Sequence, residues 1–296
     1  MTSIFFLAAL LWPTRLCSGD WCYHSQFPCD TCKGPDEWTS LFPTCGGQSQ
    51  SPINIVTRRV QYDPTLTPFV FEGYDTVSSI TVQKHENNVH FVLPPEVGVQ
   101  GGGLSGRYKA TQLHLHWGID GQPGSEHRVD GEQYAMELHI AHEKEQPKSE
   151  EDDNEHAVLA FFIEESGERN EALDYLLNAM NSVLYSGNQT SIDFRLNDII
   201  PAASDLSGYY RYSGSRTTPS CEQNVVWTVF FRTIPVSRSQ LNSVSRLWAA
   251  AGRNSSRTFR PTQRLNGRTV SCSTSALFVP WTALVWLSTT PCWDLL

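Results

Sequence analysis

Short apolar runs separated by clusters of Gly, Pro, Asn or Asp fill most of the chain between residues 50 and 235. Runs of this length, bounded by turn-forming residues, predict β-strands. We expect strands at Phe69–Phe71, Ser79–Val82, His90–Leu93, Gln112–Trp117, Tyr134–His142, Ala157–Ile163 and Val225–Phe231. Apolar residues at helical spacing predict a helix at Arg169–Tyr185, and a second helix is expected at Ser237–Trp248. The pattern therefore predicts one mainly β domain, which we place at residues 20–268.

Both ends of the chain carry apolar segments that differ from the central pattern. Ile4–Trp12 is apolar and is followed by the small residues Ser18 and Gly19, which predicts a signal peptide at residues 1–19. Near the other end, small residues at 271–275 precede the apolar run Ala276–Leu287. This order is typical of a GPI-attachment signal, which we place within residues 269–296. Because hardly any polar spacer separates the two parts, an apolar extension that packs on the fold is the alternative.

Composition and charge narrow the class of protein. The chain has 296 residues, of which 40% are hydrophobic and 18% charged, a mixture typical of globular proteins. A chain of this length can bury a large core unaided, so a metal site would more naturally serve function than folding. Its net charge of −9 argues against nucleic acid as a partner, because phosphate binding needs clustered Lys and Arg. The acidic stretch Glu143–Glu155 is interpreted as a solvated loop between strands.

Cysteines and glycosylation sequons agree with a secreted protein. Four cysteines crowd into residues 22–45 and Cys221 stands far downstream, which predicts one local and one long-range disulfide. The four are Cys22, Cys29, Cys32 and Cys45. The N-x-S/T sequons at Asn188 and Asn254 are expected glycan acceptors.

Two of the expected strands carry histidines at alternate positions. Successive side chains of a strand point to opposite faces, so Gln112, His114 and His116 share one face. Glu137 and His139 share a face of the later strand, again with apolar residues on the opposite face. The turn-rich segment 119–133 allows the two strands to pair antiparallel. That pairing would bring His139 beside the other two histidines.

Three neutral imidazoles with an open fourth position are the ligand set of a catalytic zinc ion. Structural zinc sites prefer four protein ligands, usually including thiolates, and the sequence offers no such set. Ligating histidines usually donate their second N–H to an acceptor, and Gln112 and Glu137 stand ready two residues before a histidine. The alternative is a group of core histidines with ordinary hydrogen bonds. The matching Glu-x-His strand favours zinc, with His114, His116 and His139 as the ligands.

The segments that hold these residues resemble the alpha-class carbonic anhydrases. The matching motifs are QLHLHWG (Gln112–Gly118), SEHRVDG (Ser125–Gly131), MELHIAH (Met136–His142), QSPINI (Gln50–Ile55) and SGSRTTP (Ser213–Pro219). The resemblance extends from about Trp21 to Arg268. It implies a large, twisted, mostly antiparallel sheet with short peripheral helices, and zinc-dependent reversible hydration of carbon dioxide to bicarbonate and a proton.

The N-terminal Trp-Cys-Tyr, the early cysteines and the apolar tail are similar to the extracellular, GPI-anchored members of that family. This similarity implies a Cys45–Cys221 bridge, and a partner for Cys22 that is either Cys29 or Cys32. It also implies a location at the outer leaflet of the plasma membrane. We expect a monomer whose small-molecule partners are carbon dioxide and bicarbonate.

The resemblance assigns roles around the zinc ion. Thr217 would accept a hydrogen bond from the attacking hydroxide and donate one to an ionised Glu126, which orients the hydroxide. Thr218 would contact substrate or product. His90 matches the family's proton-shuttle histidine, with Val89 in place of the usual glycine. An imidazole suits proton transfer near neutral pH, although His90 could also be an ordinary surface residue and His85 competes for the role.

The resemblance also predicts an apolar pocket for carbon dioxide, in which two positions depart from the family. The pocket would be lined by Ala141, Val158, Val225 and Trp227. Ala141 is smaller than the usual valine, which implies a roomier pocket. Arg216 stands where the family usually has a leucine. Its charged end could extend to solvent or could remain near the zinc, where it would slow product release and bind anions.

Two other functions are open to a chain with these histidines. A zinc peptidase needs the sequence H-E-x-x-H, but Val89 follows His85-Glu86 and Gln146 follows His142-Glu143 at the position of the second histidine. A carbonic-anhydrase-like binding protein with weak or no activity is the stronger alternative. Such relatives usually lack a zinc histidine, whereas all three are present here.

Overall fold

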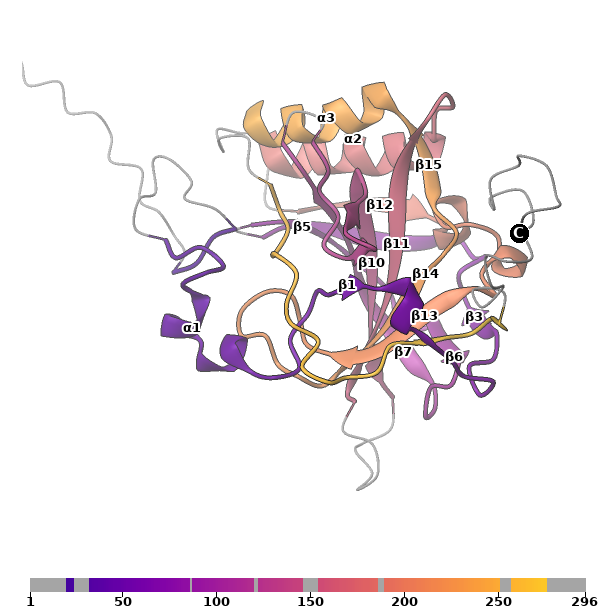
Figure 1. Cartoon of the computed structure of the whole chain (residues 1–296). Coiled ribbons are helices and arrows are strands. Elements are labelled where there is room, and N and C mark those ends of the chain that lie inside the picture. Colours follow the sequence, from indigo (N-terminus) through magenta and orange to yellow (C-terminus); the bar gives the residue numbers. More distant parts are fainter. Residues whose placement is uncertain are drawn as a thin grey trace, which may run out of the picture.

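Strands dominate the computed structural model, which describes residues 20–23, 32–85, 87–119, 122–145, 154–185, 189–250 and 257–275 (Figure 1). Within these residues, thirteen strands form one sheet. Its main path runs through β12 (Gln189–Phe194), β4 (Ser78–Lys84), β5 (Val89–Val92), β7 (Tyr108–Trp117), β10 (Met136–Lys144), β11 (His156–Ser166), β14 (Val225–Phe230), β13 (Tyr209–Gly214), β16 (Ser271–Cys272) and β2 (Gln61–Tyr62). Off this path, the sheet includes β3 (Phe69–Glu72), β6 (Gly98–Gly101) and β15 (Ile234–Ser237). The mainly β prediction is confirmed.

Smaller elements surround the sheet. A separate small sheet contains β1 (Asn54–Ile55), β8 (Arg128–Val129) and β9 (Glu132–Gln133). The α-helices are α1 (Trp38–Leu41), α2 (Glu171–Tyr185) and α3 (Arg238–Ala250). Single 3-10 turns occupy Pro43–Gly46, Thr57–Arg59, Leu196–Asp198 and Ala203–Asp205. Helices α2 and α3 lie side by side at one end of the molecule, at the top of Figure 1. Both expected helices are therefore present, each shifted by one or two residues.

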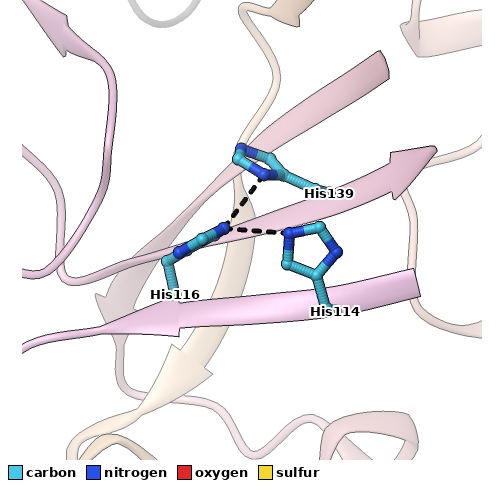
Figure 2. Close-up of side chains that lie close together, drawn as sticks. All are labelled: His114, His116 and His139. Carbon is cyan, nitrogen blue, oxygen red and sulfur yellow. Dashed lines mark hydrogen bonds between the residues drawn. The ribbon is translucent and has the colours of Figure 1, made fainter. Parts of the chain in front are cut away.

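The central strands β7 and β10 pair antiparallel, and their register decides which side chains meet. His139 of β10 lies directly across from His114 of β7 (Figure 2). In the same register, Glu137 pairs with His116. The other neighbour of β10 is β11, where Ala141 faces Val158. Most pairings in the sheet are antiparallel, but β14 and β15 run parallel to β11. The antiparallel pairing of β7 with β10, predicted from the alternation of apolar and polar residues, is therefore present.

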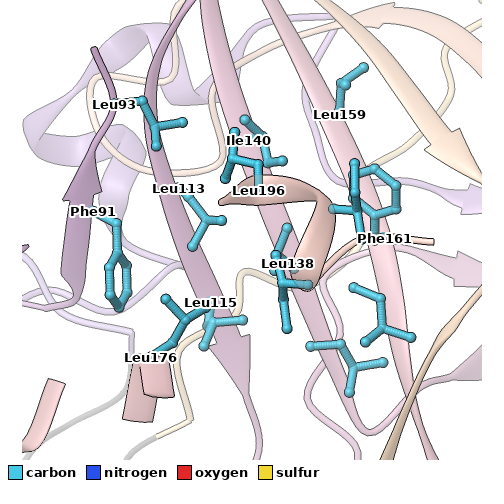
Figure 3. Packing of buried hydrophobic residues seen from close by; sticks show 14 of the residues in the cluster. Phe91, Leu93, Leu113, Leu115, Leu138, Ile140, Leu159, Phe161, Leu176 and Leu196 are labelled. Carbon is cyan, nitrogen blue, oxygen red and sulfur yellow. The ribbon is translucent and has the colours of Figure 1, made fainter. Parts of the chain in front are cut away.

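The opposite face of these strands forms the main hydrophobic core. Leu113 and Leu115 of β7 pack with Leu138 and Ile140 of β10, beneath Leu176 of α2 (Figure 3). Each of these side chains is at most 1% exposed. Burying an aliphatic side chain of this size contributes about 1.5–3 kcal/mol, so a one-residue slip of either strand would be costly. The core therefore holds the register that brings the polar face together.

A buried histidine next to this core makes stability depend on pH. The Tyr74 hydroxyl donates to Nε2 of His142 at 2.8 Å, and Nδ1–H of His142 donates to the Ala157 carbonyl at 3.2 Å. Burial lowers the pKa of His142 to about 4. An imidazole in an unfolded chain titrates near 6.5, so on acidification the unfolded state takes up the proton first.

We expect this group to reduce the free energy of unfolding by about 3 kcal/mol as the pH falls from about 6.5 to 4. The His142→Gln variant should lack this part of the pH dependence. Urea unfolding of both proteins at several pH values measures it, and the comparison cancels any acid effect that the two share. Parallel pH profiles for the two proteins would contradict the assignment to His142.

Two disulfides connect parts of the described chain. Cys45 pairs with Cys221, as the resemblance implied, and Cys22 pairs with Cys32. Cys29, the other possible partner of Cys22, lies outside the described residues. So do the expected signal peptide, the apolar C-terminal run, Asn188 and Asn254. Among the helices of the described chain, none has the length and apolar character needed to cross a membrane.

Candidate metal centre and active site

Three imidazole nitrogens converge on one point at the polar face of β7 and β10 (Figure 2). Nε2 of His116 lies 3.0 Å from Nε2 of His114 and 3.1 Å from Nδ1 of His139. His116 and His139 are fully buried, while His114 is partly exposed to the neighbouring cavity. The structure therefore brings together the three histidines that alternation selected.

The second nitrogen of each ring has a hydrogen-bond acceptor. Nδ1–H of His114 donates to Oε1 of Gln112 at 2.8 Å, and Nε2–H of His139 donates to Oε1 of Glu137 at 2.6 Å. Nδ1–H of His116 donates to the carbonyl oxygen of Thr258. These bonds place each ring proton away from the centre and leave the three inward nitrogens with free lone pairs. That donor set fits a tetrahedral zinc ion with an open fourth position.

The electrostatics of the rings also suit a metal. Burial lowers the pKa of His116 to about 4, and burial is the leading cause of the lowered pKa of His114 and His139 as well. The rings are therefore neutral at physiological pH. Metal binding requires this form, because a protonated imidazole has no lone pair to donate.

Glu137 links the histidine centre to the neighbouring segment through its hydrogen bonds. Its carboxylate accepts hydrogen bonds from the backbone N–H groups of Glu126 and His127, each at 2.8 Å, and from the rings of His127 and His139, each at 2.6 Å. Burial alone would raise the pKa of Glu137, but His127 and His139 hold it well below its usual value. An ionised Glu137 thus orients His139. The role of His127 was missed by the sequence interpretation, although it lies in the quoted SEHRVDG motif.

A buried carboxylate oxygen faces the centre without a partner. Oε1 of Glu126 accepts from the Arg260 backbone N–H at 2.9 Å. Oε2 has no hydrogen-bond partner in the described chain and lies 3.4 Å from Nε2 of His116. Burial raises the pKa of Glu126 to about 7, while His139, the Arg260 amide and the Thr217 hydroxyl act in the opposite direction. An unpaired buried oxygen at this place fits a site built to receive a further polar group.

A cavity of about 370 Å³ opens onto the histidine centre. Its lining includes the expected pocket residues Ala141, Val158, Arg216, Val225 and Trp227, together with Thr217 and Thr218, which were expected to contact the reacting groups. It also includes Trp21, Tyr23, Glu143 and His156, which the sequence interpretation missed. Glu143 and His156 face each other across β10 and β11, two residues beyond Ala141 and Val158. Alternation along these strands could have identified this second pair.

Arg216 lies at the exposed part of the cavity lining. Its backbone N–H donates to the Glu222 carbonyl at 3.0 Å. The guanidinium is near enough to contribute to the lowered pKa values of His90, His114 and His156, although burial is the larger cause for each. Of the two arrangements open at the sequence level, exposure of the side chain favours the one in which the charged end extends to solvent.

His90 lines the same cavity from β5. Its ring centroid lies 4.1 Å from that of His85 and 5.5 Å from that of His114. Burial, followed by the charges of His85, His116 and Arg216, lowers the pKa of His90 to about 3. His90 is therefore neutral at physiological pH, unlike the freely titrating imidazole expected from the resemblance.

Comparison with known proteins gives a consistent picture. Residues 33–274 match the family described as eukaryotic-type carbonic anhydrase. The chain is 42% identical over 264 residues to carbonic anhydrase 4 of Oryctolagus cuniculus, which covers 86% of this chain and 85% of that protein. It is 39% identical over 279 residues to carbonic anhydrase 15 of Mus musculus, which covers 88% and 85%, respectively. The matched span contains β7 and β10, and with them the histidine centre.

Proposed function

Because the chain belongs to the eukaryotic-type carbonic anhydrase family and is a carbonic anhydrase, we propose that it hydrates carbon dioxide with a zinc ion held by His114, His116 and His139. The observation that carries the proposal is the donor set, in which all three outer ring nitrogens donate to acceptors and all three inner ones converge. A binding protein with weak or no activity is not favoured, since nothing in this set is missing.

A bound zinc ion would lower the pKa of a water ligand to about 7 and so supply hydroxide at neutral pH. Around it, the buried Oε2 of Glu126 would accept a hydrogen bond from the Thr217 hydroxyl, whose oxygen would then accept a hydrogen bond from the attacking hydroxide. This pair orients the nucleophile, and Thr218 contacts substrate or product. Ala141, Val158, Val225 and Trp227 provide an apolar wall for carbon dioxide, with extra room at Ala141.

The direct test is metal analysis combined with a stopped-flow hydration assay on the secreted protein. We expect one zinc ion per chain and rapid hydration of carbon dioxide. Zinc at full occupancy without hydration would favour the binding protein. Absence of zinc from an active preparation would contradict the proposed metal.

We propose that the mature enzyme begins after residue 19 and is anchored at the cell exterior through a GPI group. The apolar segments at residues 4–12 and 276–287 support this location. Ser271 and Cys272 belong to β16, beyond the expected end of the domain at residue 268, and Ser273 donates to the Ser207 carbonyl. We therefore expect the GPI group to be attached after these paired residues.

Phosphatidylinositol-specific phospholipase should release the protein from the surface of expressing cells. The released protein should lack the apolar tail, which mass spectrometry of its C-terminal peptide would detect. Secretion of a chain that still contains Trp281 and Trp286 would contradict the anchor, as would surface protein that resists the enzyme. The same experiment on protein treated with glycosidase reports whether Asn188 and Asn254 carry glycans.

Although its charged end extends to solvent, Arg216 is near enough for its charge to act on His90, His114 and His156, so we expect the enzyme to be somewhat slower and more sensitive to anions than a variant with leucine. Because exposed charge pairs contribute at most about 1 kcal/mol, Arg216→Leu should weaken inhibition by simple anions by up to about fivefold. The hydration rate should rise slightly, and the pH profile should move to higher pH. Arg216→Lys keeps the charge and serves as the control. If Arg216→Leu is unchanged in rate, pH profile and anion inhibition, Arg216 has no role at the site.

A further inference from the structure

Strand β12 ends the main path of the large sheet and pairs with β4 alone. With six residues, it is the longest strand of the described chain that has a single neighbour, since β3 and β15 have four residues and β2 has two. Within the described residues, the backbone groups along the outer edge of β12 have no hydrogen-bond partner. Such an edge can accept a further strand, because its free N–H and C=O groups can pair with an extended segment.

A surface hollow of about 630 Å³ lies against the end of this strand. Its lining comes from Val77 just before β4, the first turns of α2, and residues at the end of β12 and directly after it, and we call it the α2–β12 hollow. The ring of Tyr175 in α2 stacks on that of Phe194, with centroids 6.1 Å apart and an interplanar angle of 10°. Tyr175 is 45% exposed and Val77 is 61% exposed, so the hollow presents apolar surface to solvent next to the open edge.

The α2–β12 hollow is negatively charged. The cation in its lining, Arg195, is already paired, with Nη2 2.8 Å from Oδ1 of Asp198. The carboxylates of Glu171 and Asp193 are exposed and have no ion-pair or hydrogen-bond partner in the described chain. Glu171 lies in the first turn of α2, where free helix N–H groups favour an acid. Asp193 belongs to the edge strand, where no helix end accounts for its charge.

These charges select among the partners that could pair with β12. A second copy of this chain would bring another Asp193 and a net charge of −9 to the same edge, and like charges on an edge strand oppose such pairing. An extended segment with Lys or Arg at alternate positions has the complementary charge. Because side chains alternate along a strand, its basic residues can share one face and meet Asp193 and Glu171. Their aliphatic stems can pack on Tyr175 and Val77, and their charged ends can interact with the tyrosine ring.

We propose that the outer edge of β12 and the α2–β12 hollow form a docking surface for an extended, basic segment of a partner protein. The six residues of β12 span about 20 Å, which is enough for a segment of similar length. The residues that line the hollow are all different from those that line the cavity at the histidine centre. The docking surface is therefore separate from the reaction site, and the proposal does not depend on the proposed hydration activity.

The test titrates the secreted protein by calorimetry with a capped peptide of three Lys-Val repeats at low salt. Exposed charge pairs and cation–π contacts each contribute up to about 1 kcal/mol, so Asp193→Asn and Tyr175→Ala should each weaken binding by about twofold to fivefold. The double variant should weaken it by about tenfold. The matched control is Asp36→Asn, which removes the same charge from an exposed residue before α1, on a different side of the molecule from α2 (Figure 1). It should bind the peptide like the unmodified protein.

Two further measurements separate strand pairing from simple attraction of charge. A Lys-Val peptide that is N-methylated at alternate residues keeps its charge but loses the N–H donors of one edge, so it should bind at least about tenfold more weakly. Hydrogen exchange followed by mass spectrometry should show slower exchange of the backbone amides at Gln189–Phe194 when the unmethylated peptide is bound. Because Asn188 directly precedes β12 and is an expected glycan acceptor, both measurements are made before and after glycosidase treatment. Binding to neither form would overturn the proposal.

Other outcomes would also contradict the docking surface. Equal affinity for the N-methylated peptide, or for lysine amide alone, would reduce the hollow to a site for small cations. Equal affinity of the unmodified protein and the Asp193→Asn/Tyr175→Ala variant would place the peptide elsewhere on the molecule. Dimers in sedimentation experiments, with slow exchange at β12 in the absence of peptide, would assign the edge to a second copy of this chain instead of a basic partner.

Discussion

Replacing His116 by alanine is expected to abolish zinc binding and to reduce carbon dioxide hydration by at least about a thousandfold, because hydroxide is scarce at neutral pH unless a metal lowers the pKa of water from 15.7 to about 7. His116 is the middle member of the centre, with Nε2 within 3.1 Å of an imidazole nitrogen on either side. Two remaining imidazoles are too few for a stable catalytic zinc site. Metal analysis after dialysis and a stopped-flow assay measure both effects.

The control for this variant is His142→Gln. His142 is also a buried histidine of β10, but it bonds to Tyr74 and Ala157 and not to the centre. It should keep one zinc ion per chain and normal turnover near neutral pH. His116→Ala should still give a cooperative unfolding transition, which separates loss of the metal from loss of the fold. A dialysed His116→Ala protein that keeps zinc and full activity would contradict the assigned ligand set.

The histidine centre could be predicted because it depends on short-range geometry. Alternation with a period of two places His114 and His116 on one face, and the turn-rich connection to the next strand allows only a few pairings. The leucines on the other face supply the energetic reason for the observed register, since any slip would expose them. Local pattern and core burial therefore agree on the same arrangement.

Contacts that join distant segments could not be predicted in this way. The carbonyl of Thr258 that orients His116 lies 142 residues further along the chain, and the Arg260 amide that binds Glu126 lies 134 residues away. Every residue type can offer a backbone carbonyl, and every type except proline a backbone N–H. The identity of the residue therefore does not predict these contacts. The low pKa of His90 likewise depends on burial by several elements, which a motif cannot convey.

The pairing of Cys22 shows the same limit. The resemblance left Cys29 and Cys32 as alternative partners, and the structure pairs Cys22 with Cys32. The backbone N–H of Cys22 also donates to the Lys33 carbonyl at 2.8 Å, next to the bridge. The disulfide and this hydrogen bond hold Trp21 and Tyr23 in the cavity wall. The position of Trp21 and Tyr23 in the cavity wall therefore depends on a local disulfide for which the sequence left two possible partners of Cys22.

The second large effect is expected for the Cys45–Cys221 disulfide, which closes a separation of 176 residues. In the chain-entropy model, a loop of that length stabilises the fold by roughly 5 kcal/mol, against roughly 3 kcal/mol for a loop of about ten residues. For a domain of this size, 5 kcal/mol corresponds to a fall of about 10–20 °C in Tm. The Cys45→Ser/Cys221→Ser double variant should show it in calorimetry.

This disulfide also supports the active-site loop. The backbone N–H of Cys221 donates to the Thr218 carbonyl at 2.8 Å, and the Arg260 guanidinium donates to the Cys45 carbonyl at 2.9 Å. The bridge thus ties the loop that carries Thr217 and Thr218 to the segment that reaches Glu126. Without it, we expect hydration measured well below the lowered Tm to fall as well, while zinc content stays at one per chain because β7 and β10 are untouched.

The matched control is Cys22→Ser/Cys32→Ser, which removes a bridge with a sequence separation of only 10. Its Tm should fall by about half as much, since the entropy of loop closure grows with the logarithm of loop length. Equal losses of Tm in the two variants would contradict the loop-length argument. An unchanged hydration rate in the Cys45→Ser/Cys221→Ser protein would show that hydrogen bonds alone keep Thr217 in place. The two measurements are independent, because Tm reports the cost of ordering the chain, whereas turnover reports the position of Thr217 relative to Glu126.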